Sequence, residues 1–362
     1  MINIHFYMKI HELKQQILAG ATFDREELYE KFESFRSEEP LIYNIETTNA
    51  CNMTCVFCPR TTLMTREIEH LNEEVCEKII DQIKPWTKDE WKTWEDFVAR
   101  EYGIQDDEMS QNHFFLYIIP KVIVLHGFGD PLLDKKLANR VRSLTKKGID
   151  TYFSCNPSNI SVKKNIEMME AGLSYLKYSI DSIDDLTHKT LRGKSSNYTL
   201  AFKKIMETIE EKEKRNLKTR IVITMIDLQR STQQEEWEQL QEVFKSHNVY
   251  IYLKSQDQTW YDDIQGEKDL HAAAGLSVDW SEFCHFPWSS FAVKSNGEIA
   301  MCTEDYNNEI ILGNAATESL YDIWNGEKYS NFRRTHFNKK SGDKCNMCTD
   351  HCDKRIIGDF LI

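Results

Sequence analysis

Short apolar runs alternate with longer amphipathic stretches over the middle of the chain. The apolar runs are rich in Ile, Val and Tyr and mostly end in turn or polar residues, which is typical of buried strands. They occupy residues 41–46, 121–126, 151–154, 176–180, 219–225 and 249–253. The amphipathic stretches occupy residues 72–83, 134–147, 161–171, 198–215 and 233–247. This alternation predicts βαβ units and a parallel sheet, either open and doubly wound or curved into a partial barrel.

Two segments interrupt the alternation. Residues 1–40 are polar with a helical pattern and stop at Pro40, so we expect an N-terminal helical extension. The connection between the first two strands is far longer than one crossover needs, and its part from about 85 to 118 contains three tryptophans. We expect an inserted helical element there. It is either a lid over the active site or a packed insertion without a function of its own.

A third departure begins after about residue 265, where the strand–helix rhythm ends and the chain becomes loop-rich and cysteine-rich. We expect a separate small domain in this part. The predicted organisation is a helical extension at 1–40, an α/β domain at 41–265 with the insertion at 85–118, and a cysteine-rich domain at 266–362.

The charge and the apolar pattern exclude several kinds of partner. The 362 residues include 45 Lys and Arg against 58 Asp and Glu, a formal net charge of −13 without a basic block. This balance argues against a nucleic acid or an anionic membrane surface. No window has the roughly 18 uncharged apolar residues of a membrane span, and charged residues follow Phe6 too closely for a signal peptide. We expect a cytoplasmic protein whose ten cysteines are reduced and able to bind metal.

Three cysteines lie in one short loop directly after the first predicted strand. Cys51, Cys55 and Cys58 form a C-x3-C-x2-C pattern, and thiolates from such loops hold iron–sulfur clusters. Three local ligands would leave one iron of a [4Fe–4S] cluster open to a small molecule, as in catalytic rather than structural metal sites. The alternative is a zinc site completed by a distant fourth residue.

The segment ETTNACNMTCVFCPR, residues 46–60, resembles the signature of the radical S-adenosylmethionine (radical SAM) superfamily, and Phe57 matches its aromatic residue before the third cysteine. This resemblance implies that the open iron binds the amino and carboxylate groups of S-adenosylmethionine. Reductive cleavage, with electrons from a donor such as flavodoxin or ferredoxin, then gives a 5′-deoxyadenosyl radical that abstracts a substrate hydrogen. It also implies a partial (β/α)6 TIM-like barrel with the cysteine loop at the C-terminal ends of the strands.

Further segments are similar to motifs of the same superfamily. The stretch HGFGDP after the second strand is similar to its G-G-E-P motif, with Phe128 and Asp130 as departures. The usual T-N-G triplet after the third strand is replaced by Cys155-Asn156-Pro157, and SIDS and LRG follow the fourth strand. The resemblance assigns cofactor contacts to Phe57, Gly127, Gly129, Asp130, Pro131, Ser154, Asn156, Ser179, Asp181 and Arg192. Arg192 would pair with the cofactor carboxylate.

A second cysteine set lies near the C-terminus. Cys284 and Cys302 flank AVKSNGEIAMC, in which Asn296-Gly297 predicts a β-hairpin, and Cys345, Cys348 and Cys352 follow. The region resembles the auxiliary-cluster domains called SPASM and twitch. The count implies one auxiliary [4Fe–4S] cluster on Cys284, Cys302, Cys345 and Cys348, with Cys352 as a substitute ligand or a spare. A structural zinc ribbon is the alternative.

The substrate is the least determined feature. Only about 40 residues precede the first strand, too few for the leader-binding module of many peptide-modifying relatives, so we expect a small polar substrate such as a sugar or an aminocyclitol. Oxidation would need a base, for which Asp181 and Glu304 are candidates, whereas epimerisation would need a hydrogen-donating thiol such as Cys155 or Cys352. The isolated Cys76 and Cys155 otherwise fit small buried hydrophobes. A peptide- or protein-modifying maturase and a non-catalytic electron-transfer or scaffold protein remain alternatives.

Overall fold

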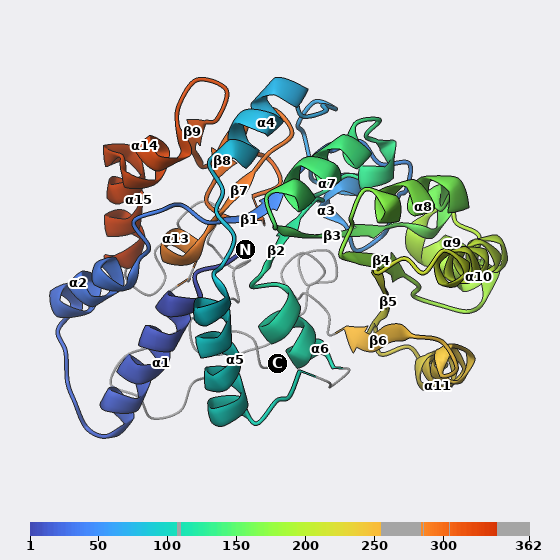
Figure 1. Ribbon diagram of the computed structural model, residues 1–362, viewed down its shortest axis with the longest axis horizontal. Helices are drawn as coiled ribbons and strands as arrows, with labels where there is room; N and C mark the ends of the chain where they lie inside the picture. The colour runs from blue at the N-terminus through green and yellow to red at the C-terminus, as the bar shows by residue number, and fades with distance from the viewer. Residues whose placement is uncertain (107–109, 255–283, 285, 304, 339–362) are drawn as a thin grey trace.

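The parallel sheet has the predicted strands in a continuous order. The computed structural model describes residues 1–106, 110–254, 284, 286–303 and 305–338. These residues form a nine-stranded sheet with the order β6-β5-β4-β3-β2-β1-β7-β8-β9. The predicted strands are β1 Ile42–Ile45, β2 Val122–Val124, β3 Asp150–Cys155, β4 Tyr175–Ser179, β5 Arg220–Ile226 and β6 Val249–Lys254, all parallel to one another. The α/β class with a six-stranded partial barrel is therefore confirmed (Figure 1).

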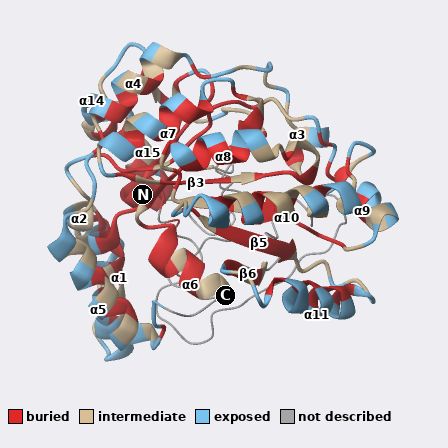
Figure 2. Ribbon diagram, turned by 45° about the vertical axis from the view of Figure 1, so that its right-hand side comes forward, coloured by how far each residue is buried: buried red, intermediate tan, exposed pale blue. Residues whose placement is uncertain are grey.

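Five helices cover the outer face of these strands, and each coincides with a predicted amphipathic stretch. They are α4 Glu73–Asp81, α7 Leu137–Lys146, α8 Val162–Glu170, α10 Tyr198–Lys214 and α11 Gln233–Phe244. Their apolar sides and alternate strand residues such as Phe153 and Ile221 make the main core. Figure 2 shows strands β3 and β5 buried, while the helices near them expose one side to solvent. Side chains of Asn72, Ser161 and Asn197 cap α4, α8 and α10, which explains where these helices begin.

Short elements follow the C-terminal ends of the first four strands, where the site residues lie. They are α3 Pro59–Thr62, η2 Pro131–Leu133, η3 Pro157–Asn159 and α9 Asp185–Arg192. Three of them start with proline, whose fixed φ and missing N–H suit the first position of a helical turn.

The insertion between β1 and β2 is helical, as predicted. It contains α5 Lys88–Tyr102, α6 Gln111–His113 and the π-helix η1 Phe114–Ile118. Trp94 is fully buried and donates its indole N–H to the Leu116 carbonyl at 2.7 Å. Phe114 and Ile118 pack on the concave face of the sheet, in a cluster that includes Tyr152, Val222 and Tyr250.

The position of the insertion shows that the lid interpretation is wrong. Ser110 N–H donates to the Tyr250 hydroxyl at 3.1 Å, and Tyr250 is the second residue of β6. The indole N–H of Trp86 donates to Pro120 O at 3.0 Å, just before β2, and Lys121 lies over the Trp91 ring. All these contacts are at the amino ends of the strands. Because η1 leads almost directly into β2, its apolar side chains fill the bottom of the barrel rather than cover its opposite end.

The predicted hairpin is confirmed, and it extends the barrel sheet. β7 Phe291–Val293 pairs in parallel with β1, and β8 Glu298–Ala300 and β9 Ile311–Asn314 follow as antiparallel strands. Gly297 in the turn has φ +84°, a conformation that glycine adopts without strain. The hairpin that leads to Cys302 is thus attached to the strand that precedes the Cys51 loop.

The N-terminal extension packs onto the C-terminal part of the chain. Its helices are α1 Ile4–Leu18 and α2 Arg25–Phe35, and the C-terminal helices are α13 Phe286–Ser289, α14 Leu320–Asn325 and α15 Glu327–Phe337. The Phe32 ring meets the rings of Trp288 and Phe337 edge to face, with centroids 5.3 Å and 5.1 Å away. These aromatic contacts join the two ends of the described chain.

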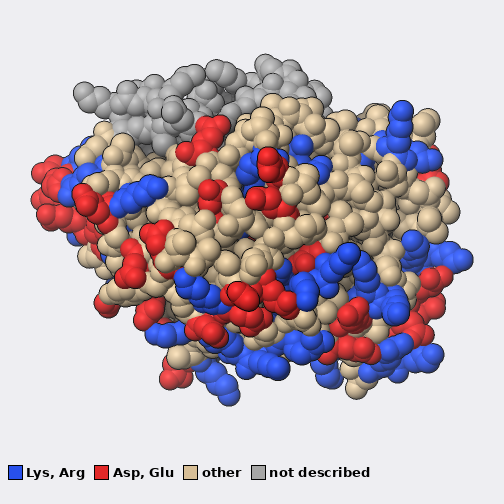
Figure 3. Space-filling model, turned by 90° about the horizontal axis from the view of Figure 1, so that it is seen from above, with Lys and Arg blue, Asp and Glu red and all other residues tan. Residues whose placement is uncertain are grey.

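The surface carries mixed charge. Lys and Arg side chains are interspersed with Asp and Glu on the face seen in Figure 3. Across the described ranges, we find no helix with both the length and the apolar character needed to cross a bilayer.

Candidate active site

The three-cysteine loop lies at the C-terminal end of β1 and runs into α3. Cys55 is buried, whereas Cys51 and Cys58 are partly exposed. Burial raises the pKa of all three thiols, and the nearby Cys55 and Cys51 help to raise that of Cys58 to about 12. The three thiols are thus close enough to influence one another's ionisation.

The donor set of this loop fits an iron–sulfur cluster. Within the described ranges, no three Cys, His, Asp or Glu side chains meet the geometry of a site for one metal ion. Each thiolate of a [4Fe–4S] cluster binds a different iron, so its ligands are spaced more widely than those of a single ion. Arg192 and Arg60 favour the thiolate forms that such a cluster requires, because their charges lower the pKa of Cys51. Cys51, Cys55 and Cys58 would hold the cluster.

The loop after β2 packs directly against the entrance to the cysteine loop. Asp130 N–H donates to Ala50 O at 2.8 Å. A Cβ atom on Gly129 would lie 2.1 Å from Thr48 O, and one on Gly127 would lie 2.6 Å from a Glu46 carboxylate oxygen. The two glycines are therefore required for this close approach of backbones. Pro131 is buried and begins η2 directly after this loop.

Gly129 provides a test of the packing. We expect Gly129→Ala to weaken S-adenosylmethionine binding by about tenfold or more, because the backbone of residues 48–50 must shift by more than a core accommodates cheaply. Equilibrium binding to the anaerobically reconstituted protein measures this. Gly148→Ala is the control, because a Cβ atom on residue 148 would meet nothing within 4 Å. The φ of +76° at Gly148 gives this control variant a backbone strain of its own. Equal affinities of the two variants would contradict the packing interpretation.

Asp130 and Asn156 join the second and third loops to the first. Asn156 donates its backbone N–H to Asp130 Oδ2 at 3.0 Å and its side-chain Nδ2 to the same oxygen at 2.5 Å. The same Nδ2 lies 3.8 Å from Cys51 Sγ. Burial raises the pKa of Asp130, and the hydrogen bond from the Asn156 backbone opposes this rise. Asn156 thus links two predicted cofactor-binding segments to a predicted cluster ligand.

The Leu191–Gly193 turn holds the other side of the cysteine loop. Thr54 N–H donates to Arg192 O at 3.2 Å, and Val56 N–H donates to Leu191 O at 2.9 Å. Gly193 has φ +97°, and a Cβ there would lie 2.1 Å from the Thr54 hydroxyl oxygen. The L-R-G segment therefore shapes the cysteine loop through its backbone.

Arg192 forms a buried ion pair with Asp181. Its Nε and Nη2 both lie 2.5 Å from Asp181 Oδ2, and its guanidinium lies over the Phe57 ring at 5.3 Å. Arg192 Nη1 is 4.0 Å from Cys55 Sγ. Asp181 also accepts the Ile226 N–H at 3.1 Å. Both carboxylate oxygens of Asp181 thus have partners within the protein, Arg192 and the Ile226 N–H, which argues against its use as the catalytic base.

Polar side chains lie on the concave face of the sheet. They are nearer the C-terminal ends of the strands than the apolar cluster to which the insertion contributes. Ser154 donates its N–H to His126 Nδ1 at 3.2 Å, and its hydroxyl is 3.2 Å from that of Ser179. The His126 ring lies 5.2 Å from that of Tyr152, over which Lys177 is placed. Burial and the charges of Lys177 and Lys254 lower the pKa of His126 to about 3. The imidazole is therefore neutral at physiological pH.

Cys155 faces the other side of the sheet. It is buried in the core beneath the outer helices, and its Sγ lies 3.8 Å from Lys177 O. Cys76 of α4 is also fully buried in this core. Ser154 lies on the concave face, so its neighbour Cys155 points away from it because successive strand residues alternate. This placement argues against Cys155 as a hydrogen-atom donor to a substrate in the barrel.

Two of the auxiliary cysteines lie in the described part of the chain. Cys284 and Cys302 are both buried, and the Cys284 N–H donates to His336 Nε2 at 3.2 Å. Burial raises the pKa of Tyr329 far above its ordinary range, and both thiols contribute to that rise. Both cysteines are thus near enough to the Tyr329 hydroxyl to influence its ionisation. Cys345, Cys348, Cys352 and Glu304 lie outside the described residues, and their roles stay predictions.

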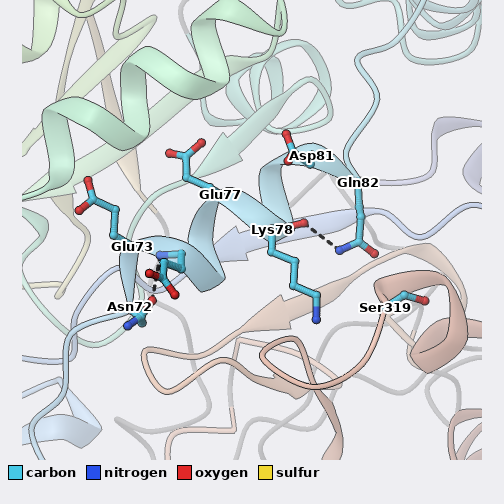
Figure 4. A pocket seen from close by; sticks show the side chains of 8 residues that line it. Asn72, Glu73, Glu77, Lys78, Asp81, Gln82 and Ser319 are labelled. Carbon is cyan, nitrogen blue, oxygen red and sulfur yellow. Dashed lines mark hydrogen bonds between the residues drawn. The ribbon is translucent and has the colours of Figure 1, made fainter.

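A surface groove of about 1100 Å³ lies elsewhere, along the exposed side of α4 (Figure 4). Its lining residues are mostly charged or polar: Asn72, Glu73, Glu74, Glu77, Lys78, Asp81, Gln82 and Ser319. The groove is on the outer helical layer, so it is separate from the strand ends where the cysteine loop lies.

Several polar residues near the C-terminal ends of the strands were not predicted from the sequence. They are Glu46, Arg66, His126, Lys177, Lys254 and Lys294. Glu46 and His126 end or follow strands within the quoted motifs, so strand parity could have placed them on the concave face. No sequence signal pairs Arg66 or Lys294 with these residues.

Comparison with known proteins gives one family match and several similar folds. A family model described as an iron–sulfur cluster-binding domain, SPASM, matches residues 284–352. The fold resembles that of Streptococcus suis SuiB bound to S-adenosylmethionine, with a TM-score of 0.51 and 16% identity, covering 90% of this chain and 77% of that chain. Residues 284–352 are thus similar to SPASM iron–sulfur cluster-binding domains, and the chain has a fold like that of SuiB.

Two further similarities are more limited. A 69-residue stretch is 28% identical to the S-adenosyl-L-methionine-dependent 2-deoxy-scyllo-inosamine dehydrogenase of Niallia circulans, covering 18% of this chain and 28% of that protein's length. The structure of BtrN in complex with AdoMet and 2-DOIA aligns with a TM-score of 0.45 and 16% identity, over 82% of this chain and 87% of that chain.

Proposed function

We propose that the chain is an enzyme that binds a [4Fe–4S] cluster through Cys51, Cys55 and Cys58 and reductively cleaves S-adenosylmethionine there. The resulting 5′-deoxyadenosyl radical would abstract a hydrogen atom from a small polar substrate, such as a sugar or an aminocyclitol. The net reaction is most simply an oxidation. The reducing electron would come from a donor such as flavodoxin or ferredoxin.

One observation carries the proposal: segments that follow β2, β3 and β4 meet around the cysteine loop that follows β1. The loop after β2 contacts Ala50, Asn156 after β3 contacts Cys51, and the turn beyond β4 binds the amides of Thr54 and Val56. A structural cluster site needs only its ligands. The additional glycine and amide contacts support a site built to bind a second molecule at the cluster.

The concave face supports a polar substrate. Hydroxyl, imidazole and ammonium groups lie on this face toward the C-terminal ends of the strands. They come from Ser154, Ser179, His126 and Lys177. Such groups orient a hydroxylated or aminated ring better than an apolar one. The name of the curated relative, a dehydrogenase of an aminocyclitol, agrees with this class although the matched stretch is short.

The placement of Cys155 supports oxidation, because it leaves Cys352 as the remaining candidate donor for an epimerisation. An epimerase needs a thiol that returns a hydrogen atom, and Cys155 faces the core rather than the concave surface. In an oxidation, the substrate loses one hydrogen atom to the radical, a proton to a base and an electron to an acceptor. An auxiliary cluster on Cys284, Cys302, Cys345 and Cys348 would accept that electron, with Cys352 as the substitute ligand.

Product analysis tests the proposed function. Anaerobically reconstituted protein, supplied with reductant and S-adenosylmethionine, is expected to release 5′-deoxyadenosine and methionine in equal amounts. Iron and sulfide analysis should show cluster loading rather than zinc. A zinc-loaded, colourless protein would overturn the proposal, and a cluster-loaded protein that forms no 5′-deoxyadenosine would support the electron-transfer or scaffold alternative. Deuterium transfer into 5′-deoxyadenosine from a labelled peptide, and not from labelled cyclitols or sugars, would support the maturase alternative.

A further inference from the structure

The carboxylate of Glu46 is completely buried where the barrel meets the C-terminal hairpin. Glu46 directly follows β1, and its N–H donates to Val293 O of β7 at 2.8 Å. A charged group in such a position is costly unless it is paired and hydrogen-bonded. The partners of Glu46 therefore indicate what the charge is used for.

Arg66 makes a bidentate pair with this carboxylate. Its Nη1 lies 2.8 Å from Oε2 and its Nη2 lies 2.9 Å from Oε1 of Glu46. The Arg66 side chain is itself only 7% exposed, so the pair is shielded from water. Burial alone would raise the pKa of Glu46, but the hydrogen bonds and charge of Arg66 hold it below its ordinary value. Glu46 is thus ionised and has two acceptor oxygens available for backbone amides.

Those two oxygens bind two different functional segments. Oε1 accepts the Phe128 N–H at 3.0 Å, and Phe128 lies in the G-F-G loop that packs on the cysteine loop. Oε2 accepts the Ser295 N–H at 3.2 Å, in the hairpin that leads to Cys302. One carboxylate therefore connects the predicted S-adenosylmethionine loop with the predicted auxiliary-cluster segment.

Arg66 also binds the segment that follows Cys302. Its Nε donates to Tyr306 O at 2.8 Å. Lys294 adds a parallel contact, because its Nζ donates to Asp305 O at 2.5 Å and lies over the Phe128 ring at 5.6 Å. The segment around Cys302 is thus held before and after the cysteine by residues that also touch the G-F-G loop.

We propose that the Glu46–Arg66 pair is a positioning clamp that fixes the Cys302 segment relative to the G-F-G loop and transmits binding of S-adenosylmethionine to that segment. The transmission rests on the proposed function, whereas the clamp does not. Binding that orders Phe128 strengthens its bond to Glu46, and the same carboxylate holds Ser295. Neither Glu46 nor Arg66 is expected to touch the substrate.

Two conservative variants separate the clamp from general stability. Glu46→Gln keeps the size of the side chain but has one acceptor oxygen, so it cannot serve Phe128, Ser295 and both Arg66 nitrogens at once. Arg66→Lys keeps the charge but loses the planar fork. Glu67→Gln is the matched control, because Glu67 is an exposed carboxylate in the same loop as Arg66.

The measurement is hydrogen–deuterium exchange of the reconstituted full chain, followed by mass spectrometry of peptides covering residues 127–130 and 293–303. Without ligand, we expect exchange in both peptides to be about tenfold faster in Glu46→Gln and in Arg66→Lys than in wild type. Exchange in β4 and β5 should stay unchanged, which shows that the barrel is folded. Faster exchange in only one of the two peptides, or in neither, would overturn the clamp.

Addition of S-adenosylmethionine tests the transmission. In wild type and in Glu67→Gln, exchange should slow in both peptides. In Glu46→Gln it should slow only in residues 127–130. Equal slowing of residues 293–303 in Glu46→Gln would overturn the transmission. If wild type does not bind S-adenosylmethionine at all, the proposed function and the transmission both fail, and the ligand-free comparison still decides whether the clamp exists.

Discussion

Replacing Cys51, Cys55 and Cys58 together by alanine will abolish the cleavage of S-adenosylmethionine. The expected loss is complete within detection, because these thiols would be the protein ligands of the cluster that supplies the electron. The triple variant should also lose about four irons per chain. Electron paramagnetic resonance of the reduced protein should then show a single remaining cluster signal, from the C-terminal site.

The control for this prediction is Cys76→Ala. Cys76 is a buried cysteine of the outer core, so its removal should cost some stability and leave iron content and cleavage intact. Retention of both cluster signals in the triple variant would show that the three cysteines are not the ligands. Loss of both signals at once would show that the two sites are not independent.

Arg192→Gln is expected to destabilise the barrel strongly. It leaves Asp181 as a buried unpaired carboxylate, and breaking a buried pair in this way costs about 3–5 kcal/mol in unfolding free energy. The same change removes the guanidinium over Phe57 and beside Cys55. We therefore expect a lower midpoint in chemical denaturation and faster amide exchange at Thr54 and Val56, whose acceptors are in the Leu191–Gly193 turn.

A double-mutant cycle distinguishes this ion pair from a simple packing loss. Asp181→Asn combined with Arg192→Gln removes both charges, so the double variant should be less destabilised than the sum of the single ones. Arg215→Gln is the surface control, because Arg215 pairs with Glu170 and Glu211 in solvent and should change the unfolding free energy by less than about 1 kcal/mol. Additive effects of Asp181→Asn and Arg192→Gln would contradict the coupling.

Much of the fold could be predicted because it depends on local patterns. Each parallel strand lies within a few residues of its apolar run, and the Asn296-Gly297 turn forms the expected hairpin. The cysteine loop, the G-F-G-D-P loop and the L-R-G turn also meet as the resemblance implied. Parallel strands bring their C-terminal ends to one edge, so residues that follow them converge whatever their separation in sequence.

The errors concern features that local patterns do not specify. The aromatic content of residues 85–118 indicated a packed element, but not which end of the barrel it would fill. The Arg192–Asp181 ion pair was not foreseen, because the two residues come from separate motifs, and the assignment of Arg192 to the cofactor carboxylate stays a prediction. Glu46 was not singled out, since its partners Arg66, Phe128 and Ser295 come from three distant parts of the chain.

The pairing of β7 with β1 has a consequence for the order of synthesis. Ile42 lies opposite Phe291. One edge of β1, the first barrel strand, is therefore paired only by a segment that is synthesised much later. Until the ribosome has produced that segment, β1 would present an open edge to other chains, which is an aggregation hazard. Nascent or shortened chains that contain all six barrel strands but lack β7 would therefore still depend on chaperones.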